Sequence, residues 1–574
     1  MKELFKLLKG KYIFMSVLTP LLIIGEVVME VSIPKIMSKI VDIGIAGKDI
    51  SFVLKTGGIM VVMAIISLCF GALASWTASI AGIGFGKEVR KSLFYKIQDF
   101  SFANVDKLGT ASLITRMTTD VSNLQNAYMM VIRSLVRAPI MMITASVMAF
   151  SINPGLACVF LIAIPILGVL LSLIITNAHP RFKQMLKKFD RLNQKIQENL
   201  IGIRVVKAFV RGDFENKEFQ KASGDVRDAQ VKAEKLIIMN MPIMQLMIYT
   251  CIIVILWIGG NKVVAGSMGT GELVSFISYV NQILMSIMMV AMSFTMLVIS
   301  KASINRIVEV LNTVSDIPDN GNSDLKVEDG SILFKNVSFS YDGTEKNNVL
   351  ENINLEIKSG ETIGIIGGTG SSKSTLVQLI PRLYEATSGE VFVGGKNIKE
   401  YKQETLRSEV AMVLQNNVLF TGTILENLRW GNTNATDEEI ETACKAAQAH
   451  EFITDFPDGY QTVLGQGGVN VSGGQKQRLC IARALLKKPK IIILDDSTSA
   501  VDTATDSKIR KAFRKELADT TTIIIAQRIS SVQDADRIVI LDEGSICGIG
   551  THQELLQTSE IYKEIYQSQQ KGVA

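Results

Sequence analysis

The chain has 574 residues, which is more than a single ordinary domain needs, and 48% of them are hydrophobic. Its formal net charge of +5 is too small for this length to indicate nucleic acid binding, so we expect no nucleic acid partner. Six cysteines are scattered without CxxC or metal-binding spacing, and we expect small apolar roles for them. Residues 1–11 are basic, but the apolar segment that follows has no small-residue cleavage site, so we expect no cleavable signal peptide.

The first half contains six apolar segments, each long enough to cross a bilayer as a helix, which takes about 20 residues. Two of the connections, residues 85–127 and 178–236, are long and carry most of the Lys and Arg residues of this half. The positive-inside rule therefore predicts a multi-pass cell-membrane protein whose termini and long connections are cytoplasmic. The six segments lie near residues 13–39, 53–84, 128–151, 155–177, 237–260 and 272–299.

The long connections keep a helical spacing of apolar residues, as at Phe182, Leu186 and Phe189. We therefore expect membrane helices that extend well into the cytosol and are joined in pairs by short turns near Gly109–Thr119 and Ala208–Phe214. The alternative is a pair of solvated, charged connections. Helices extended in this way would suit a membrane protein that is mechanically coupled to a domain on the cytoplasmic side of the membrane.

Four charged residues lie within the predicted membrane helices. Glu26 and Glu30 share one helix face, and Arg133 and Arg137 share another, because each pair is four residues apart. A lone charge in lipid costs several kcal/mol or more. Glu–Arg pairing, contact with a substrate, and a position near the membrane edge all remain open. The methionines of the last apolar segment either line an adaptable cavity or fill the membrane interior.

The second half changes to strands that alternate with helices, which predicts a mostly parallel sheet flanked by helices. A polar stretch with Pro318 and Gly321 separates the two patterns. The expected fold is therefore multi-domain, with an all-α six-helix transmembrane domain followed by an α/β nucleotide-binding domain. We place these domains at residues 1–315 and 331–574, with a linker at residues 316–330.

A phosphate-binding loop lies in "ETIGIIGGTGSSKSTLVQLI", between an apolar strand and a helix. Its glycines let backbone N–H groups point at phosphate oxygens, Lys373 reaches the β- and γ-phosphates, and Ser374 is a Mg²⁺ ligand. Ser372 stands where the motif has glycine, and we expect the loop to accommodate the serine with some crowding. The predicted nucleotide-binding residues here are Gly367, Gly368, Thr369, Gly370, Ser371, Ser372, Lys373, Ser374 and Thr375.

Two further motifs accompany the loop. "KIIILD" ends in Asp495, which would hold Mg²⁺ directly or through water, and together with the loop it predicts an ATPase or GTPase fold. In "NVSGGQKQRLCIARAL", Ser472, Gly473 and Gly474 precede an amphipathic helix, which is again an anion-binding arrangement. The simplest reason for a second phosphate-binding helix end is a nucleotide held by another copy or by a partner.

This order of motifs resembles the ATP-binding cassette (ABC) transporter superfamily, in particular exporters with one membrane domain fused to one nucleotide-binding domain. The resemblance covers essentially the whole chain. Gly367–Thr375 then correspond to Walker A, Ile491–Asp495 to Walker B, Ser472–Gln475 to the signature and Ser499–Asp502 to the D-loop. "GTASLITRMTTDV" and "GIRVVKAFVRGDFE" look like the two cytoplasmic coupling segments.

The resemblance also implies roles for single residues. Tyr341 would stack on adenine, Gln415 would bind Mg²⁺ and touch the coupling turns, and Asp502 would belong to the interface between cassettes. In this family two cassettes sandwich two ATP molecules, and each site combines one chain's Walker motifs with the other chain's signature. Gln475 and the residues before it would therefore serve the partner's ATP.

Besides Ser372, two residues and one short stretch depart from the family pattern. Asp496 stands in place of the catalytic glutamate, which withdraws the carboxylate by about 1.5 Å, and misplacement of about 1 Å can cost on the order of a hundredfold in rate. Gln527 stands in place of the switch histidine and cannot become a cation beside the γ-phosphate. The stretch "GQGGVN" before the signature also lacks the Glu-Arg usual in exporters.

These features are similar to the degenerate-site subunit of a heterodimeric multidrug exporter. The resemblance implies an ATPase that uses ATP and Mg²⁺, exports amphipathic drug-like or lipid-like molecules, pairs with a second half-transporter chain in the bilayer, and hydrolyses ATP weakly in its own site. The alternatives are a homodimeric exporter or lipid flippase with tolerated substitutions, a nucleotide-gated channel or regulator, and an importer.

Overall fold

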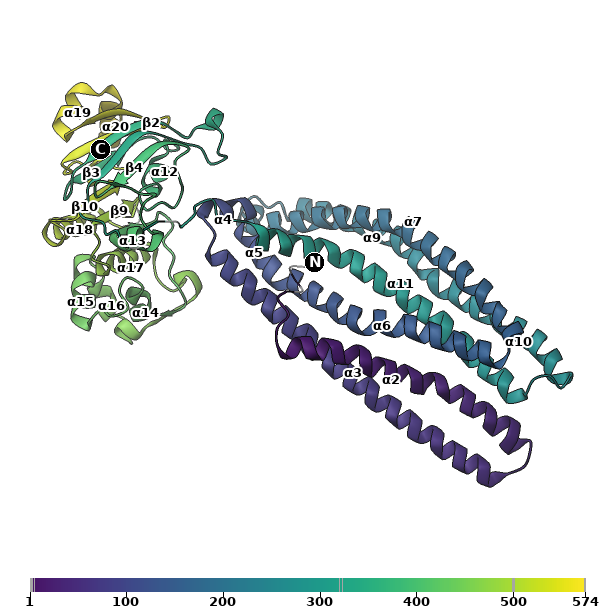
Figure 1. Cartoon of the computed structure of the whole chain (residues 1–574). Coiled ribbons are helices and arrows are strands. Elements are labelled where there is room, and N and C mark those ends of the chain that lie inside the picture. The colour runs from purple at the N-terminus through teal and green to yellow at the C-terminus, as the bar shows by residue number, and fades with distance from the viewer. Residues whose placement is uncertain (1–3, 5, 320, 323, 498–500, 572–574) are drawn as a thin grey trace. The chain divides into compact units, whose positions relative to one another are not determined.

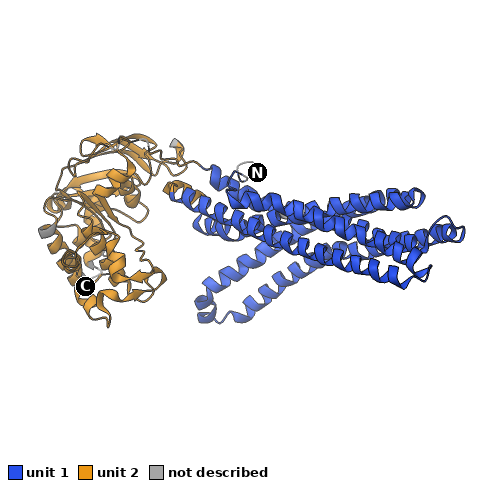
Figure 2. Ribbon diagram, turned by 60° about the horizontal axis from the view of Figure 1, so that its bottom comes forward, with its two compact units in different colours: residues 1–98, 109–313 blue, residues 99–108, 314–574 orange. Residues whose placement is uncertain are grey.

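The computed structural model describes residues 4, 6–319, 321–322, 324–497 and 501–571. The chain forms two compact units, one of residues 1–98 and 109–313 and the other of residues 99–108 and 314–574 (Figure 2). A short piece of the first half thus belongs to the unit that contains the second half.

The first unit consists of long helices (Figure 1). Among the described residues, six helical stretches of 35 to 53 residues are long and apolar enough to cross a membrane, which confirms the predicted six membrane helices. Their length beyond the roughly 20 residues that a bilayer needs also confirms that they extend past the membrane. The helices are α2 (Lys11–Lys39), α3 (Ile50–Gln98), α5 (Thr110–Thr115), α6 (Val121–Ile152), α7 (Pro154–Ile201), α8 (Ile203–Ala208), α9 (Gly212–Ile238), α10 (Asn240–Val264) and α11 (Thr270–Asn312), with π-helical turns η1 (Ile40–Ile45) and η2 (Arg116–Asp120).

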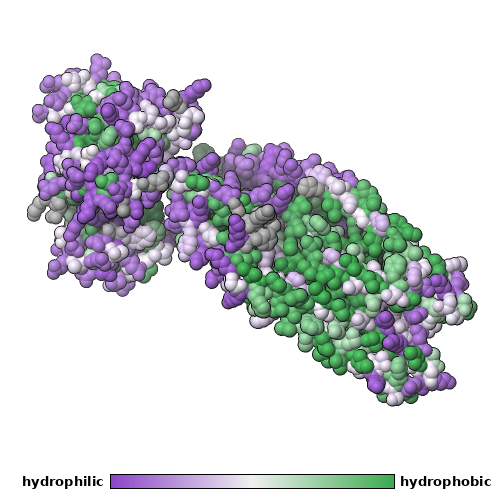
Figure 3. Space-filling model, in the orientation of Figure 1, coloured by the Kyte–Doolittle hydropathy of each residue, from purple (hydrophilic) through white to green (hydrophobic). Residues whose placement is uncertain are grey.

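The surface of this unit is apolar over its middle portion, as the green area in Figure 3 shows on one face. Large apolar side chains of this unit, such as Leu68, Leu161 and Trp257, are more than half exposed. An apolar surface of this extent is unfavourable in water and matches a lipid environment.

Asp42 fixes the N-terminus of α11. Its carboxylate accepts hydrogen bonds from the backbone N–H of Gly271 at 2.6 Å and of Glu272 at 3.1 Å. A Cβ atom at Gly269 or Gly271 would lie closer than 3 Å to the Asp42 side chain. The glycines therefore make room for an acidic cap at the positive end of this helix dipole.

The first cytoplasmic turn lies earlier than expected. The helix α3 ends at Gln98, a short helix α4 (Phe102–Leu108) follows, and the chain is helical again from Thr110, so the expected turn at Gly109–Thr119 is wrong. Gly109, with φ of 74°, ends α4 instead of beginning the turn. The second turn, α8 and residues 209–211, overlaps the expected segment.

The second unit contains two larger sheets and a small one, with a β2-β1-β4-β5 order in the first and β12-β11-β3-β10-β9-β6 in the second. The first is antiparallel, while in the second only the β11–β12 pair is antiparallel. The strands are β1 (Ile332–Phe339), β2 (Leu350–Ile357), β3 (Thr362–Ile366), β4 (Ser388–Val393), β5 (Lys396–Asn397), β6 (Val410–Val413), β7 (Gly422–Thr423), β8 (Val463–Leu464), β9 (Ile491–Asp495), β10 (Thr521–Ile525), β11 (Arg537–Asp542) and β12 (Ser545–Gly550).

Helices cover this mixed sheet, which confirms the predicted α/β architecture. Every residue of β9 is buried, as expected for a central parallel strand. The helices are α12 (Lys373–Gln378), α13 (Gln403–Glu409), α14 (Ile424–Arg429), α15 (Asp437–Ala446), α16 (His450–Thr454), α17 (Gly473–Leu486), α18 (Thr503–Glu516), α19 (His552–Thr558) and α20 (Glu560–Lys571).

Candidate nucleotide-binding site

The carboxyl ends of four neighbouring parallel strands, β3, β10, β9 and β6, meet at one edge of the large sheet. Ligands of open α/β sheets bind at this edge. The phosphate loop follows β3, Gln527 follows β10, Asp496 follows β9 and Gln415 follows β6. A cavity of about 350 Å³ opens there, lined by Val349, Thr369, Gly370, Ser372, Lys373, Ser374, Thr375, Gln415, Asp495, Asp496, Ile525 and Gln527.

The structure thus brings together residues from four separate sequence motifs. Gly367, Gly368 and Ser371 belong to the same loop but do not line the cavity. Val349 and Ile525 line it although no motif predicted them. A single apolar residue before or within a strand gives no sequence signal that separates a cavity wall from the core.

The glycines of the phosphate loop are required by its backbone. Gly370 has φ of 88°, and a Cβ at Gly367 would lie 2.0 Å from the carbonyl oxygen of Leu541. Lys373 begins α12, and its Nζ donates to the carbonyl oxygens of Gly367 at 3.0 Å and Gly368 at 2.7 Å. Burial lowers the pKa of Lys373, while the charges of the two aspartates oppose this shift.

Ser372 has φ of 68° and ψ of 23°, which is the left-handed region. This conformation costs an L-residue roughly 1–2 kcal/mol, and glycine is the residue that adopts it freely. The cost of serine at this position is therefore backbone strain, where the sequence had suggested crowding.

Asp495 and Ser374 form the oxygen-rich part of the site. The Ser374 hydroxyl donates to Asp495 Oδ1 at 2.9 Å, and Asp495 is 3% exposed. Burial raises the pKa of Asp495, and the neighbouring Asp496 charge raises it further. A buried carboxylate, a hydroxyl and the nearby Gln415 amide are hard oxygen donors, and this donor set fits Mg²⁺.

Asp496 lies between two amide side chains. The Gln527 Nε2 donates to Asp496 Oδ2 at 3.2 Å, and Gln415 also forms a hydrogen bond with this carboxylate. Burial raises the pKa of Asp496, while Lys373, Gln415 and Arg528 oppose the shift. The two residues that depart from the family pattern at the catalytic positions therefore contact each other.

The loop that carries Gln527 is held by the last helix. The Gln569 side chain of α20 donates to the Gln527 carbonyl oxygen at 2.7 Å and accepts from the Ile529 N–H at 2.9 Å. No sequence motif predicted these two hydrogen bonds, which we call the Gln569 brace.

Tyr341 lies beside the phosphate loop with about half of its surface exposed. Its hydroxyl forms a hydrogen bond of 2.9 Å with the Thr375 hydroxyl of α12, so the ring is attached to the phosphate-binding helix. Phe339 and Tyr384 contact the ring edge to face. An exposed ring held in this way can stack on a purine.

Ser472 caps the N-terminus of the 14-residue helix α17. Its hydroxyl accepts from the Gln475 N–H at 3.3 Å, and the Gln475 side chain accepts from the Ser472 N–H at 2.8 Å. Ser472 and Gly473 are exposed, and neither they nor Gly474 line the nucleotide cavity of this chain. This anion-binding helix end is therefore available to a nucleotide held elsewhere.

Asp502 caps α18 by accepting from the Thr505 N–H at 2.9 Å. Ser499 and Ala500 of the expected D-loop lie outside the described residues.

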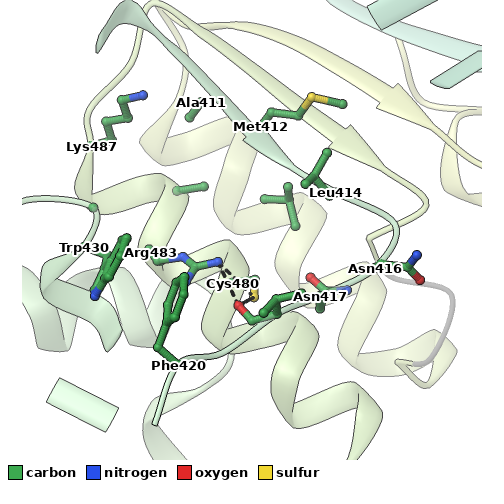
Figure 4. A pocket seen from close by; sticks show the side chains of 14 residues that line it. Ala411, Met412, Leu414, Asn416, Asn417, Phe420, Trp430, Cys480, Arg483 and Lys487 are labelled. Atoms are coloured by element: carbon green, nitrogen blue, oxygen red, sulfur yellow. Dashed lines mark hydrogen bonds between the residues drawn. The ribbon is translucent and has the colours of Figure 1, made fainter. Parts of the chain in front are cut away.

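A second cavity of about 300 Å³ is lined by residues that include Met412, Asn416 and Cys480 (Figure 4). The rings of Phe420 and Trp430 stack at 4.2 Å on one side, and Arg483 donates to the Val418 carbonyl oxygen at 3.3 Å. Its lining is mostly apolar, so it suits a hydrophobic side chain better than a phosphate.

Three of the four membrane charges come together in the first unit. Arg137 Nη2 lies 2.5 Å from Glu30 Oε2 and 3.4 Å from Glu26 Oε1. A Cβ at Gly71 would come within 3.0 Å of the Glu26 carboxylate, so this glycine leaves space for the pair. Arg133 is exposed and forms no ion pair with any residue that the structure describes.

The family model described as ABC transporter transmembrane region matches residues 16–288, and the one described as ABC transporter matches residues 350–499. The uncharacterized ABC transporter ATP-binding protein YfiB of Bacillus subtilis is 40% identical over 97% of both chains. The putative multidrug export ATP-binding/permease protein YgaD of the same organism is 32% identical over 97% of this chain and 96% of its own length. A bacterial Atm1-family ABC exporter, solved with ATP bound, has the same fold, with a TM-score of 0.84 at 24% identity over 97% of this chain and 99% of that chain.

Proposed function

Because this chain belongs to the ABC transporter family, as an exporter half-transporter whose ATPase is coupled to transport, we propose that it is the degenerate-site subunit of a heterodimeric exporter of amphipathic small molecules. The family assignment means that the chain binds ATP, dimerises with another ABC chain and crosses the bilayer several times with its ATP-binding domain in the cytoplasm. Three points are proposed beyond the family assignment: that the partner is a different chain, that this chain's own site hydrolyses ATP slowly, and that the substrates are amphipathic small molecules.

The contact between Asp496 and Gln527 carries the proposal. Attack of water on the γ-phosphate needs a carboxylate that reaches the water and a group that stabilises the developing charge. In this chain the short Asp496 side chain is held back by hydrogen bonds to Gln415 and Gln527, and the neutral Gln527 amide replaces a cationic imidazole. ATP and Mg²⁺ would therefore be held by Lys373, Ser374 and Asp495 but hydrolysed slowly.

The signature motif supports the proposal that this chain completes the partner's ATP site. The Ser472–Gln475 cap is complete, and Ser472 and Gly473 are exposed, so this helix end can close over the partner's nucleotide. Closure of the two cassettes around two Mg·ATP would drive the change from an inward-facing to an outward-facing cavity. Hydrolysis, mainly in the partner's site, would reset the transporter.

The substrate class rests on the membrane unit and on one relative. The helix α11 exposes Met285, Met292 and Met296 along one side, and flexible thioethers suit amphipathic molecules of varied shape. One relative carries the description of a putative multidrug exporter. Export of drug-like or lipid-like molecules is the class that these two observations favour.

The test is chain-resolved trapping of nucleotide in the complex that co-purifies with this chain. Labelling by a photoreactive ATP analogue that increases when vanadate is added reports the diphosphate formed by hydrolysis, and this increase should occur on the partner chain alone in the wild type and on both chains in the double variant Asp496→Glu/Gln527→His. Hydrolysis in this chain's site should rise by up to about a hundredfold. The matched control, Asp455→Glu/Gln461→His, makes the same changes at exposed positions outside the cavity and should change nothing.

An equal vanadate-dependent increase in labelling on both wild-type chains, or a purified chain that alone hydrolyses ATP as fast as the complex, would refute the degenerate site. The second outcome would favour a homodimeric exporter or flippase with tolerated substitutions.

A further inference from the structure

The short helix α4 packs against the rest of the second unit, to which it belongs. Ser101 and Asn104 cap it by exchanging backbone-to-side-chain hydrogen bonds of 3.3 and 3.2 Å. Asn104 also donates to Asp316 at 3.3 Å, and Ala103 packs against the buried core of this unit. Along the chain, α4 follows the long helix α3 after residues 99–101 and is followed by Gly109 and the short helix α5.

Asp106 of α4 also forms a hydrogen bond with the second half of the chain. The Tyr384 hydroxyl donates to Asp106 Oδ2 at 2.5 Å, and Tyr384 is only 8% exposed. Burial raises the pKa of Tyr384 and the Asp106 contact raises it further, so the phenol remains a donor at physiological pH. The Phe102 ring of α4 also contacts the Tyr384 ring at 6.0 Å between centroids.

Tyr384 also contacts Tyr341, the ring expected to stack on adenine. Tyr341 and Tyr384 meet at 89° with 5.3 Å between ring centroids, and Phe339 contacts both rings. Tyr341 is in turn hydrogen-bonded to Thr375 of the phosphate-binding helix. A continuous line of contacts therefore runs from the phosphate-binding helix α12 through two perpendicular tyrosines to a carboxylate of α4.

We propose that Tyr384 is a positioning residue that communicates occupation of the Tyr341 ring by a purine base to α4 through its hydrogen bond to Asp106. A base stacked on the exposed face of Tyr341 fixes that ring, and edge-to-face packing then fixes the Tyr384 ring and the direction of its hydroxyl. The change in α4 therefore depends on the purine base, whereas the phosphate loop responds to the phosphates. It goes beyond the proposed function, because it holds whichever chain hydrolyses ATP.

Hydrogen exchange of the full-length chain, in its complex and in lipid nanodiscs, separates the two kinds of signal. The probes are Mg·ATP and Mg·tripolyphosphate, which has phosphates but no base. Protection of α12 reports filling of the phosphate loop by either probe. Exchange of residues 102–108 should slow at least threefold with ATP and remain unchanged with tripolyphosphate at concentrations that protect α12 equally.

Two single variants isolate the hydrogen bond. In Tyr384→Phe and in Asp106→Leu, ATP should still protect α12, but the ATP-dependent protection of residues 102–108 should be lost. Asp106→Asn retains an acceptor oxygen and should restore most of it. The double variant Tyr384→Phe/Asp106→Leu should be no worse than either single variant, because both remove the same bond.

Tyr401→Phe is the matched control. Tyr401 is fully buried in the same unit, and its hydroxyl donates to the Val393 carbonyl oxygen at 2.9 Å and not to a residue of α4. It should leave the ATP response of residues 102–108 intact. The proposal is overturned if Tyr384→Phe keeps the full response, if Tyr401→Phe loses it equally, or if tripolyphosphate protects residues 102–108 as strongly as ATP.

Discussion

Two residues at the nucleotide site have a left-handed backbone conformation, Ser372 with φ of 68° and Asp496 with φ of 47°. Aspartate tolerates this region better than most residues, because its short polar side chain can bond locally. A glutamate at position 496 would gain reach but would adopt this φ less readily. Restoring the usual glutamate therefore combines faster chemistry with a small loss of stability.

We expect Ser372→Gly to stabilise the second unit. Relief of the left-handed strain should outweigh the extra backbone entropy of glycine and raise the free energy of unfolding by about 1 kcal/mol, or roughly 2–4 °C in melting temperature. ATP affinity should rise by no more than about fivefold. Calorimetry and nucleotide titration measure both quantities.

The control is Gln448→Gly, which has φ of 54° at a position outside the cavity. It should stabilise the unit without changing ATP affinity. Weaker ATP binding by Ser372→Gly would contradict the expectation and would assign the serine hydroxyl a role in binding.

At the scale of elements, the sequence patterns predicted the membrane helices and the parallel sheet well. Strand-end motifs converge because neighbouring parallel strands share one edge, so the order of motifs alone predicts that Asp495, Gln415 and the phosphate loop lie close together. The first cytoplasmic turn could not be placed, because Gly109 resembles the beginning of a turn but ends α4. Tyr384 was missed because its role arises from contacts with distant segments, Tyr341 and Asp106.

The cap on α11 gives an element-scale prediction. Asp42→Ala removes two hydrogen bonds and a favourable charge from a helix end, and we expect it to lower the free energy of unfolding by about 1–2 kcal/mol. Thermal unfolding in lipid nanodiscs measures the change. Asp49→Ala, which removes one exposed hydrogen bond to the Phe52 N–H, should have a clearly smaller effect. Equal effects would show that Asp42 does not stabilise the helix end.

At the scale of the whole molecule, the proposed heterodimer with a degenerate site would make this chain's two phosphate-binding helix ends unequal. We expect Ser472→Ala, at the end proposed to serve the partner's nucleotide, to reduce ATP turnover of the complex at least tenfold. Lys373→Ala, in the site proposed to be slow, should reduce it by no more than about threefold. Steady-state ATPase assays of the co-purified complex measure both.

Thr436→Ala is the matched control, because Thr436 caps α15 with the same kind of capping box in the same unit. It should leave turnover unchanged. A larger loss from Lys373→Ala than from Ser472→Ala would reverse the assignment of the slow site.

The Gln569 brace has a practical consequence for handling the protein. The final helix contributes to the position of the Gln527 loop, so an affinity tag fused directly after it, or proteolytic trimming of its last turn, would alter nucleotide turnover without touching any motif residue. Preparations tagged at opposite ends of the chain should therefore be compared before any rate is attributed to the transporter itself.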